Sequence, residues 1–105
     1  MKLFGESFRT ISTGIQTIEL RLYDEKRRLV RPDDQIVFTF KDKICRARVV
    51  GLTISDSFAN LAKIVNIPDT GWRDADTLAS GMRKYYTNAE QKKYGVVGIH
   101  LQPVK

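Results

Sequence analysis

The chain has 105 residues, with 18 Lys and Arg against 12 Asp and Glu, so its formal net charge is +6, and 42% of its residues are hydrophobic. This length and composition are typical of one folded domain, residues 1–105, and exclude wholesale disorder. One cysteine and one histidine exclude a disulfide framework and a multi-cysteine zinc site.

The first elements are predicted to be a short helix and a strand. Apolar residues recur at spacings of four, three and four (Phe4, Phe8, Ile11 and Ile15), which indicates one face of a helix ending near Thr13. Gly14 fits a left-handed helix terminus. Residues 17–23 then alternate, with one apolar face (Ile18, Leu20 and Leu22) and one polar face (Thr17, Glu19, Arg21 and Tyr23).

A charged loop and two further strands are expected next. Residues 24–31 are dominated by charged side chains and are predicted to loop out, and Pro32, Asp33 and Asp34 to form a turn. Residues 35–40 and 44–52 are predicted strands. The second of these strands places Arg46 and Arg48 on one face and Cys45 on the other.

The rest of the chain is predicted to contain three helices and a final strand. A helix capped by Asp56 or Ser57 buries four apolar residues (Phe58, Leu61, Ala62 and Val65), and 66–74 is irregular. Residues 75–86 form a second helix, and a capping box over 87–90 begins a third, which runs to Gly95. With 96–101 as a strand, the fold class is α+β, a small mixed β-barrel with flanking short helices.

Metal and nucleophile sites are not expected. Cys45 lies on an apparent core face, and nothing in the sequence brings His100 to it, so core packing is favoured over nucleophilic chemistry. The paired aspartates fit turns and helix caps, and the calcium-loop pattern is absent. We therefore predict no metal and no cofactor. The chain has no secretory segment and no run of about 18 apolar residues, and a cytoplasmic location is expected.

Aromatic side chains lie close in sequence to basic ones in the second half of the chain (Trp72, Tyr85, Tyr86 and Tyr94 beside Arg83, Lys84, Lys92 and Lys93). Such rings can stack on bases while the cations neutralise phosphates. The rings can equally anchor helices to the core. The sequence leaves both open, and it leaves open whether the Trp72 loop fills a cleft.

Glu19 and Arg21 form the most informative pair. They lie on the same face of one predicted strand, about 7 Å apart by strand geometry. A carboxylate beside a guanidinium can read the edge of a nucleobase and a phosphate or hydroxyl group. A cross-strand salt bridge on an exposed face explains the same spacing, so both interpretations stay open on spacing alone.

The segment from Gly14 to Arg21, Gly-Ile-Gln-Thr-Ile-Glu-Leu-Arg, resembles the Gly-x-Lys-x-x-Glu-x-Arg signature of ASCH domains, which belong to the PUA-like superfamily. The 32–38 turn and strand, Ser57-Phe58 at a helix start, and the 90–99 segment are also similar. The resemblance implies a small β-barrel with a helix-flanked cleft that binds RNA. It places Glu19 and Arg21 on the floor of that cleft.

The sequence departs from the signature at Gln16, where the family usually has lysine. Some ASCH proteins resemble an amidohydrolase that removes the acetyl group from N-acetylated cytidine, using the motif lysine and a threonine. Here the corresponding residues are Gln16 and Glu19, so neither catalytic role carries over. Glutamine does not titrate at neutral pH and cannot act as a general base.

The sequence therefore predicts a binding protein, with single-stranded or loop RNA or a nucleotide-like ligand as its partner. The predicted site comprises Gln16, Glu19 and Arg21, with flanking contacts from Arg46, Arg48, Lys92, Lys93 and Tyr94. Two alternatives remain: an amidohydrolase acting on acylated cytidine or related nucleosides, and a module that binds a protein partner, as a coactivator does.

Overall fold

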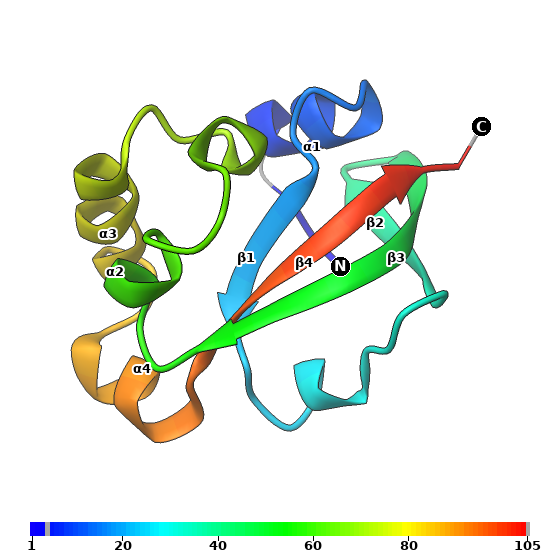
Figure 1. The fold of residues 1–105 in the computed structure, drawn as a ribbon. Coiled ribbons are helices and arrows are strands. Elements are labelled where there is room, and N and C mark those ends of the chain that lie inside the picture. The colour runs from blue at the N-terminus through cyan, green and yellow to red at the C-terminus, as the bar shows by residue number, and fades with distance from the viewer. Residues whose placement is uncertain (4, 105) are drawn as a thin grey trace.

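A computed structural model of the protein describes residues 1–3 and 5–104. It confirms the α+β class, with a curled sheet and short helices (Figure 1). The elements, with η for a 3-10 helix, are α1 (Gly5–Ser12), β1 (Ile18–Leu22), η1 (Arg27–Leu29), β2 (Gln35–Phe40), β3 (Lys43–Ser55), α2 (Phe58–Leu61), η2 (Ile67–Thr70), α3 (Ala75–Arg83), α4 (Asn88–Tyr94) and β4 (Val96–Pro103).

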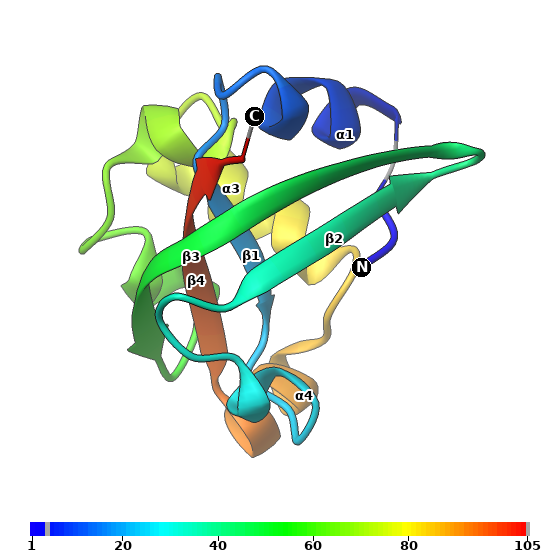
Figure 2. The ribbon, with the colours of Figure 1, turned by 90° about the vertical axis from the view of Figure 1, so that its right-hand side faces the viewer.

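The four strands form one sheet in the order β1-β4-β3-β2, and each neighbouring pair is antiparallel. β3 is long enough to pair with both β2 and β4, and its register against β4 shifts between Val49 and Gly51. Such an irregularity bends a strand. Figure 2 shows the result, in which the β2–β3 hairpin crosses over β1 and β4 as an open half-barrel.

Two hydrophobic cores cover the two faces of β1 and β4. One lies between the sheet and helices α2 and α3, and contains Ile18, Leu20, Leu22, Phe58, Leu61, Ala62, Leu78, Met82 and Val96. The other lies inside the curl and contains Ile11, Ile36, Phe38, Ala47, Val49, Val97, Ile99 and Leu101. Glu19 is paired with Ile99 and Arg21 with Val97, so both polar residues belong to the inner face of the curl.

Local signals account for several helix ends. Ser57 caps α2, and Thr87 caps α4 in a capping box with Glu90, as predicted. Gly14 follows α1 with φ of +81°, a conformation that glycine adopts without strain. Phe4, which the sequence places on the helix face, lies outside the described residues.

Other boundaries differ from the prediction. The charged segment predicted to be a loop contains η1, because the Asp24 carboxylate accepts a hydrogen bond from the Arg27 backbone N–H. β3 continues to Ser55, since that residue still pairs with Val96 of β4. Helix α3 ends at Arg83 rather than at Tyr86.

In the described part of the chain, no helix is long and apolar enough to cross a membrane.

Candidate functional site

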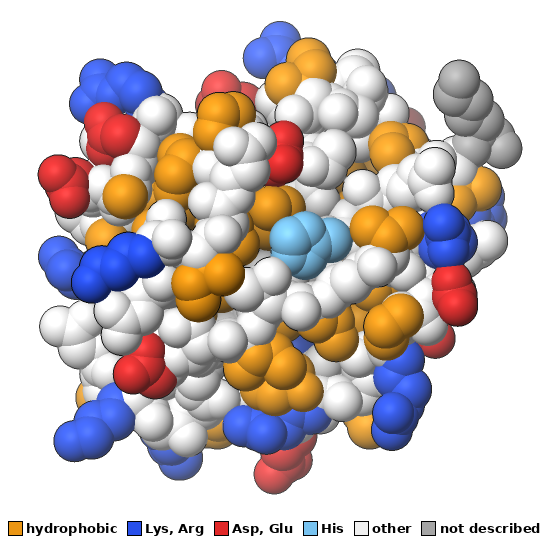
Figure 3. Space-filling model, in the orientation of Figure 1, with side chains coloured by type: hydrophobic (Ala, Val, Ile, Leu, Met, Phe, Trp, Pro, Cys, Tyr) orange, Lys and Arg blue, Asp and Glu red, His pale blue; other side chains and the backbone are white. Residues whose placement is uncertain are grey.

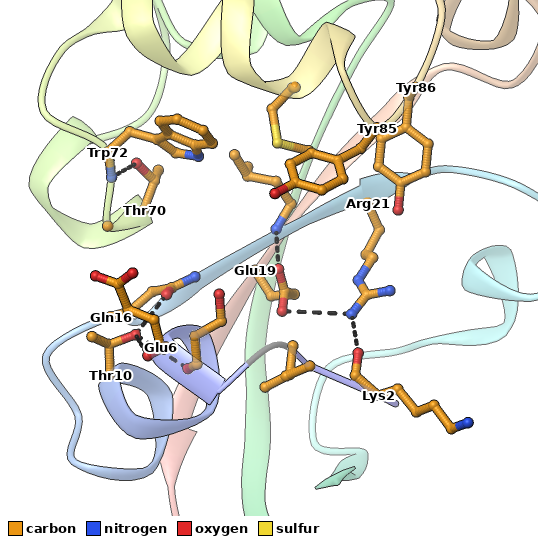
Figure 4. Close-up of a pocket in the computed structure, with 15 residues that line it drawn as sticks. Lys2, Glu6, Thr10, Gln16, Glu19, Arg21, Thr70, Trp72, Tyr85 and Tyr86 are labelled. Atoms are coloured by element: carbon orange, nitrogen blue, oxygen red, sulfur yellow. Dashed lines mark hydrogen bonds and ion pairs between the residues drawn. The ribbon is translucent and has the colours of Figure 1, made fainter. Parts of the chain in front are cut away.

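A pocket of about 320 Å³ lies between α1, β1, η2 and the end of α3. Glu19 is at its centre, and Figure 4 shows Trp72 and Thr70 on one side of it and Arg21 and Lys2 on the other. The residues that line the pocket are Lys2, Leu3, Glu6, Ser7, Thr10, Gln16, Glu19, Leu20, Arg21, Thr70, Gly71, Trp72, Met82, Tyr85 and Tyr86. All three predicted motif residues therefore meet in one cavity.

The Glu19 carboxylate is buried and only partly satisfied. The residue is 8% exposed, and its Oε1 accepts a hydrogen bond from the Leu20 backbone N–H at 3.0 Å. Its Oε2 has no hydrogen-bond partner and lies 3.7 Å from a guanidinium nitrogen of Arg21. Burial raises the pKa of Glu19, and the positive charge of Arg21 opposes that rise. Glu19 thus offers a buried oxygen whose hydrogen-bonding capacity is unused.

Arg21 is held beside this carboxylate by the N-terminal segment. Its Nη2 donates to the Lys2 carbonyl oxygen at 2.9 Å, and its side chain is 17% exposed. The prediction that Glu19 and Arg21 share one polar face is confirmed. That face is not open surface, however, because the sheet curls around it.

Both polar atoms of the Gln16 side chain are already engaged. Its Oε1 accepts from the Thr10 hydroxyl at 2.9 Å, and its Nε2 donates to the Ile18 carbonyl at 3.0 Å. The residue is 8% exposed. Gln16 therefore shapes the wall of the pocket and fixes α1 against β1.

Gln16 and Glu19 share a further role, because β1 is an edge strand. The Thr17 carbonyl accepts from the Leu101 N–H of β4, and the Tyr23 N–H donates to the carbonyl of Gly95, just before β4. The backbone groups of the even-numbered residues of β1 therefore face the open edge. The Gln16 amide covers the Ile18 carbonyl there, and the Glu19 carboxylate covers the Leu20 N–H. The motif side chains occupy the polar edge of β1 that another strand would otherwise pair with.

Trp72 forms a wall of the pocket and is held against Gly81 of α3. A Cβ atom placed on Gly81 would lie 2.2 Å from the indole ring, so only glycine lets the ring pack there. Gly71, with φ of +81°, also lies close to the Gln16 side chain, since a Cβ on it would be 3.2 Å from Oε1. The sequence alone does not reveal these roles, nor that of Thr10, because each depends on a contact between separate elements.

Arg46 and Arg48 are not brought to this pocket. They alternate along β3 with Ala47 and Val49, which face the inner core, so their side chains point to the outer face of the curl. Arg48 bonds there to Asp33 at 2.6 Å and to Gln102 at 2.9 Å.

Lys92, Lys93 and Tyr94 belong to α4, which covers the end of the sheet and does not line the pocket. Tyr94 packs against the core beneath α2 and α3, and the Lys93 ammonium lies 5.1 Å from the centre of its ring. Lys92 borders a separate shallow hollow next to Ser57 and Asn88. Lys92 and Lys93 are exposed on α4, and none of these three residues lies at the pocket of Glu19 and Arg21.

Cys45 and His100 are not neighbours. Cys45 packs against the inner core, where burial raises the pKa of its thiol. His100 pairs with Gly51, six residues further along β3, or about 20 Å at strand spacing. Its ring contacts the Thr53 hydroxyl at 2.7 Å, and Figure 3 shows the histidine on the outer face of β3 and β4. Among the described residues, no group of three or more His, Cys, Asp and Glu could hold a metal ion.

Two solved structures have the same fold as this chain. One is the crystal structure of hypothetical protein PH0355, at 33% sequence identity and a TM-score of 0.89, with 99% of this chain and 96% of that one covered. The other is the solution NMR structure of Protein PF0455 from Pyrococcus furiosus, at 31% identity and a TM-score of 0.78, with 100% and 96% covered.

No curated protein matches the chain. The family model described as the ASCH domain matches residues 1–105, which is the whole chain. This match agrees with the resemblance of the segment from Gly14 to Arg21 to the ASCH signature. The chain belongs to the ASCH domain family.

Proposed function

We propose that this protein binds RNA, single-stranded or in a loop, and that the pocket accepts one unpaired base or a nucleotide-like group. ASCH domains are commonly associated with RNA binding. The observation that carries the proposal is the buried Oε2 of Glu19, which accepts no hydrogen bond and lies 3.7 Å from the Arg21 guanidinium. A buried polar atom without a partner costs free energy, and a ligand that pairs with it recovers that cost.

The groups around the pocket suit a base edge. An ionised Glu19 accepts from a base N–H, and Arg21 can donate to a neighbouring carbonyl or phosphate oxygen. Trp72 supplies an aromatic surface in the wall, as proteins that bind unpaired bases commonly do. The volume of about 320 Å³ is at the lower end for small-ligand sites. Base edges in a duplex cannot enter such a pocket, so unpaired RNA is favoured.

Hydrolysis of an acyl group from modified cytidine is the second candidate function. It is favoured by the position of Glu19, a buried carboxyl with a raised pKa inside a pocket, because such groups can transfer protons at neutral pH. Gln16 cannot assist as a base. Incubation with N-acylated cytidine, with release of the acid monitored, tests this candidate, and absence of turnover removes it.

The binding proposal is tested by titrating single-stranded RNA at several salt concentrations. We expect Glu19→Ala and Arg21→Ala each to weaken binding by about 10- to 100-fold, the range for lost charged hydrogen bonds. Arg48→Ala, on the outer face, is the matched control and should bind as the wild type does. Circular dichroism checks that each variant is folded. Affinity that responds neither to salt nor to the two pocket substitutions would refute the proposal.

A further inference from the structure

Positive groups gather at the end of the pocket where the N-terminal segment lies. Lys2 and Arg21 both line this end. The Met1 ammonium donates to the Val37 carbonyl of β2 at 2.5 Å, and Lys2 forms a parallel bridge with Thr39. The N-terminal residues are therefore fixed alongside β2, close to the side chain of Arg21.

The turn after β1 brings two more cations to the same place. Lys26 is exposed and Arg27 is the first residue of η1. Met1, Tyr23 and Val30 pack against the same core cluster, which brings the start of the chain next to the turn that carries Lys26 and Arg27. Burial and the neighbouring charges of Arg21, Lys26 and Arg27 together lower the pKa of the Met1 ammonium. Residues from the start of the chain and from η1 thus form a single positive rim.

Acidic groups offset part of this charge, and they include Glu6, which lines the pocket, and Glu25, which precedes Lys26. Glu19 pairs with Arg21, and Asp24 pairs with Arg27 at 3.4 Å. Within residues 1–3 and 5–104, no ion pair involves Met1, Lys2 or Lys26. Five positive groups, namely Met1, Lys2, Arg21, Lys26 and Arg27, face four acidic groups, namely Glu6, Glu19, Asp24 and Glu25. The rim therefore keeps one positive charge in excess, and a pocket mouth with such an excess attracts polyanions.

Arg27 has a buried donor without a partner, whereas Arg48 on the outer face already donates to two side chains. The Nε of Arg27 is buried and has no hydrogen-bond partner. By contrast, Nη1 of Arg48 donates to Asp33 and Nη2 donates to Gln102. The Arg27 side chain is 19% exposed, so a phosphate at the rim can pair with the part of its guanidinium that faces solvent.

We infer that the RNA backbone leaves the pocket over the rim formed by Met1, Lys2, Lys26 and Arg27, so that the phosphates next to the bound base contact these groups. This inference rests on the proposed function and adds the direction in which the strand runs. It assigns the backbone contacts to the rim and not to Arg46 and Arg48, which the sequence predicts as flanking contacts and the structure places on the outer face.

The test compares two double variants that remove equal charge, Lys26→Gln with Arg27→Gln and Arg46→Gln with Arg48→Gln. The probe is a ten-nucleotide single-stranded RNA of random sequence, titrated between 50 and 200 mM salt. Each lost phosphate contact lowers the slope of log K against log salt by about 0.7 for single strands, so two contacts lower it by about 1.4. We expect this change in the rim variant and an unchanged slope in the outer-face variant.

A further variant, Lys26→Gln alone, removes an exposed charge without disturbing the Arg27–Asp24 pair. It should lower the slope by about 0.7. A slope that falls only in the outer-face variant, or in neither variant, overturns the inference about the rim. The proposed function still stands in that case if wild-type binding depends on Glu19 and Arg21. Absence of RNA binding by the wild type overturns both.

Discussion

Replacing Gly81 by alanine should destabilise the protein, although alanine is the better helix former. Gly81 lies inside α3, where the exchange by itself would contribute about 1 kcal/mol of stability. The added methyl group, however, would meet three atoms of the Trp72 ring at 2.2, 2.5 and 3.1 Å. Steric overlap and helix propensity therefore predict changes of opposite sign, and the structure decides between them.

The overlap is too large for a small adjustment to relieve. Contacts of a Cβ atom become ordinary at about 3.4 Å, so the nearest ring atom must move by 3.4 − 2.2 = 1.2 Å. Inserting a methyl group into packed structure costs roughly 1–3 kcal/mol, and two of the three distances are below 3.0 Å, which favours the upper half of that range. After subtraction of about 1 kcal/mol for helix propensity, a net loss of about 1–2 kcal/mol is expected.

Urea unfolding measured by tryptophan fluorescence reports both effects, because Trp72 is the chain's one tryptophan. We expect a lower midpoint with an unchanged slope, and an altered native-state emission. Gly51→Ala is the matched control, since a Cβ there meets His100 only at 3.9 Å or beyond. A Gly81→Ala protein that is more stable than the wild type, with the same emission, would refute the packing of Trp72 described above.

Three further substitutions test the polar contacts. Burial raises the pKa of Glu19, so folding favours the protonated carboxyl group. This contribution to the free energy of unfolding is complete below the ordinary glutamate pKa of about 4.3 and is lost as the pH rises through the pKa of the folded state. In urea unfolding, the stability of Glu19→Gln relative to the wild type should therefore increase as the pH rises from about 4.3 through the folded-state pKa of Glu19; a difference that is independent of pH would contradict this. Gln16→Ala removes two hydrogen bonds and should cost about 1–3 kcal/mol, and amide exchange should increase in β1; unchanged unfolding would be the contrary result. Gln91→Leu leaves the Phe58 N–H and the Tyr86 carbonyl without their side-chain partner and should cost about 2–3 kcal/mol in the same assay, whereas a neutral effect would show that α4 does not depend on this bond.

The parts of the fold that follow from neighbouring residues could be predicted from the sequence. Alternation along β1 placed Glu19 and Arg21 together, and the Thr87–Glu90 capping box gave the start of α4. These signals are local, because strand alternation and helix caps involve residues within a few positions of one another.

The parts of the fold that depend on how the sheet curls could not be predicted from the sequence. Alternation put Arg46 and Arg48 on one face of β3, but only the structure shows that no residue of β3 lines the pocket. Trp72 lies in a loop and contacts Gly81 of α3, nine positions further along the chain. No periodic pattern in the sequence predicts this contact. In η1, the hydrogen bond from Arg27 to Asp24 imposes a turn on a segment whose charges indicate only exposure.

The central claim, that RNA enters the pocket at Glu19 and Arg21, is tested most directly by following backbone amide and indole NMR signals during titration with single-stranded RNA. The Leu20 amide donates to the Glu19 carboxylate, and the Trp72 ring lines the same pocket. We expect both signals to shift with one saturable dependence on RNA concentration, and Arg21→Ala to weaken that dependence. Shifts confined to the outer face at Arg46 and Arg48, with the Leu20 and Trp72 signals unchanged, would contradict the claim.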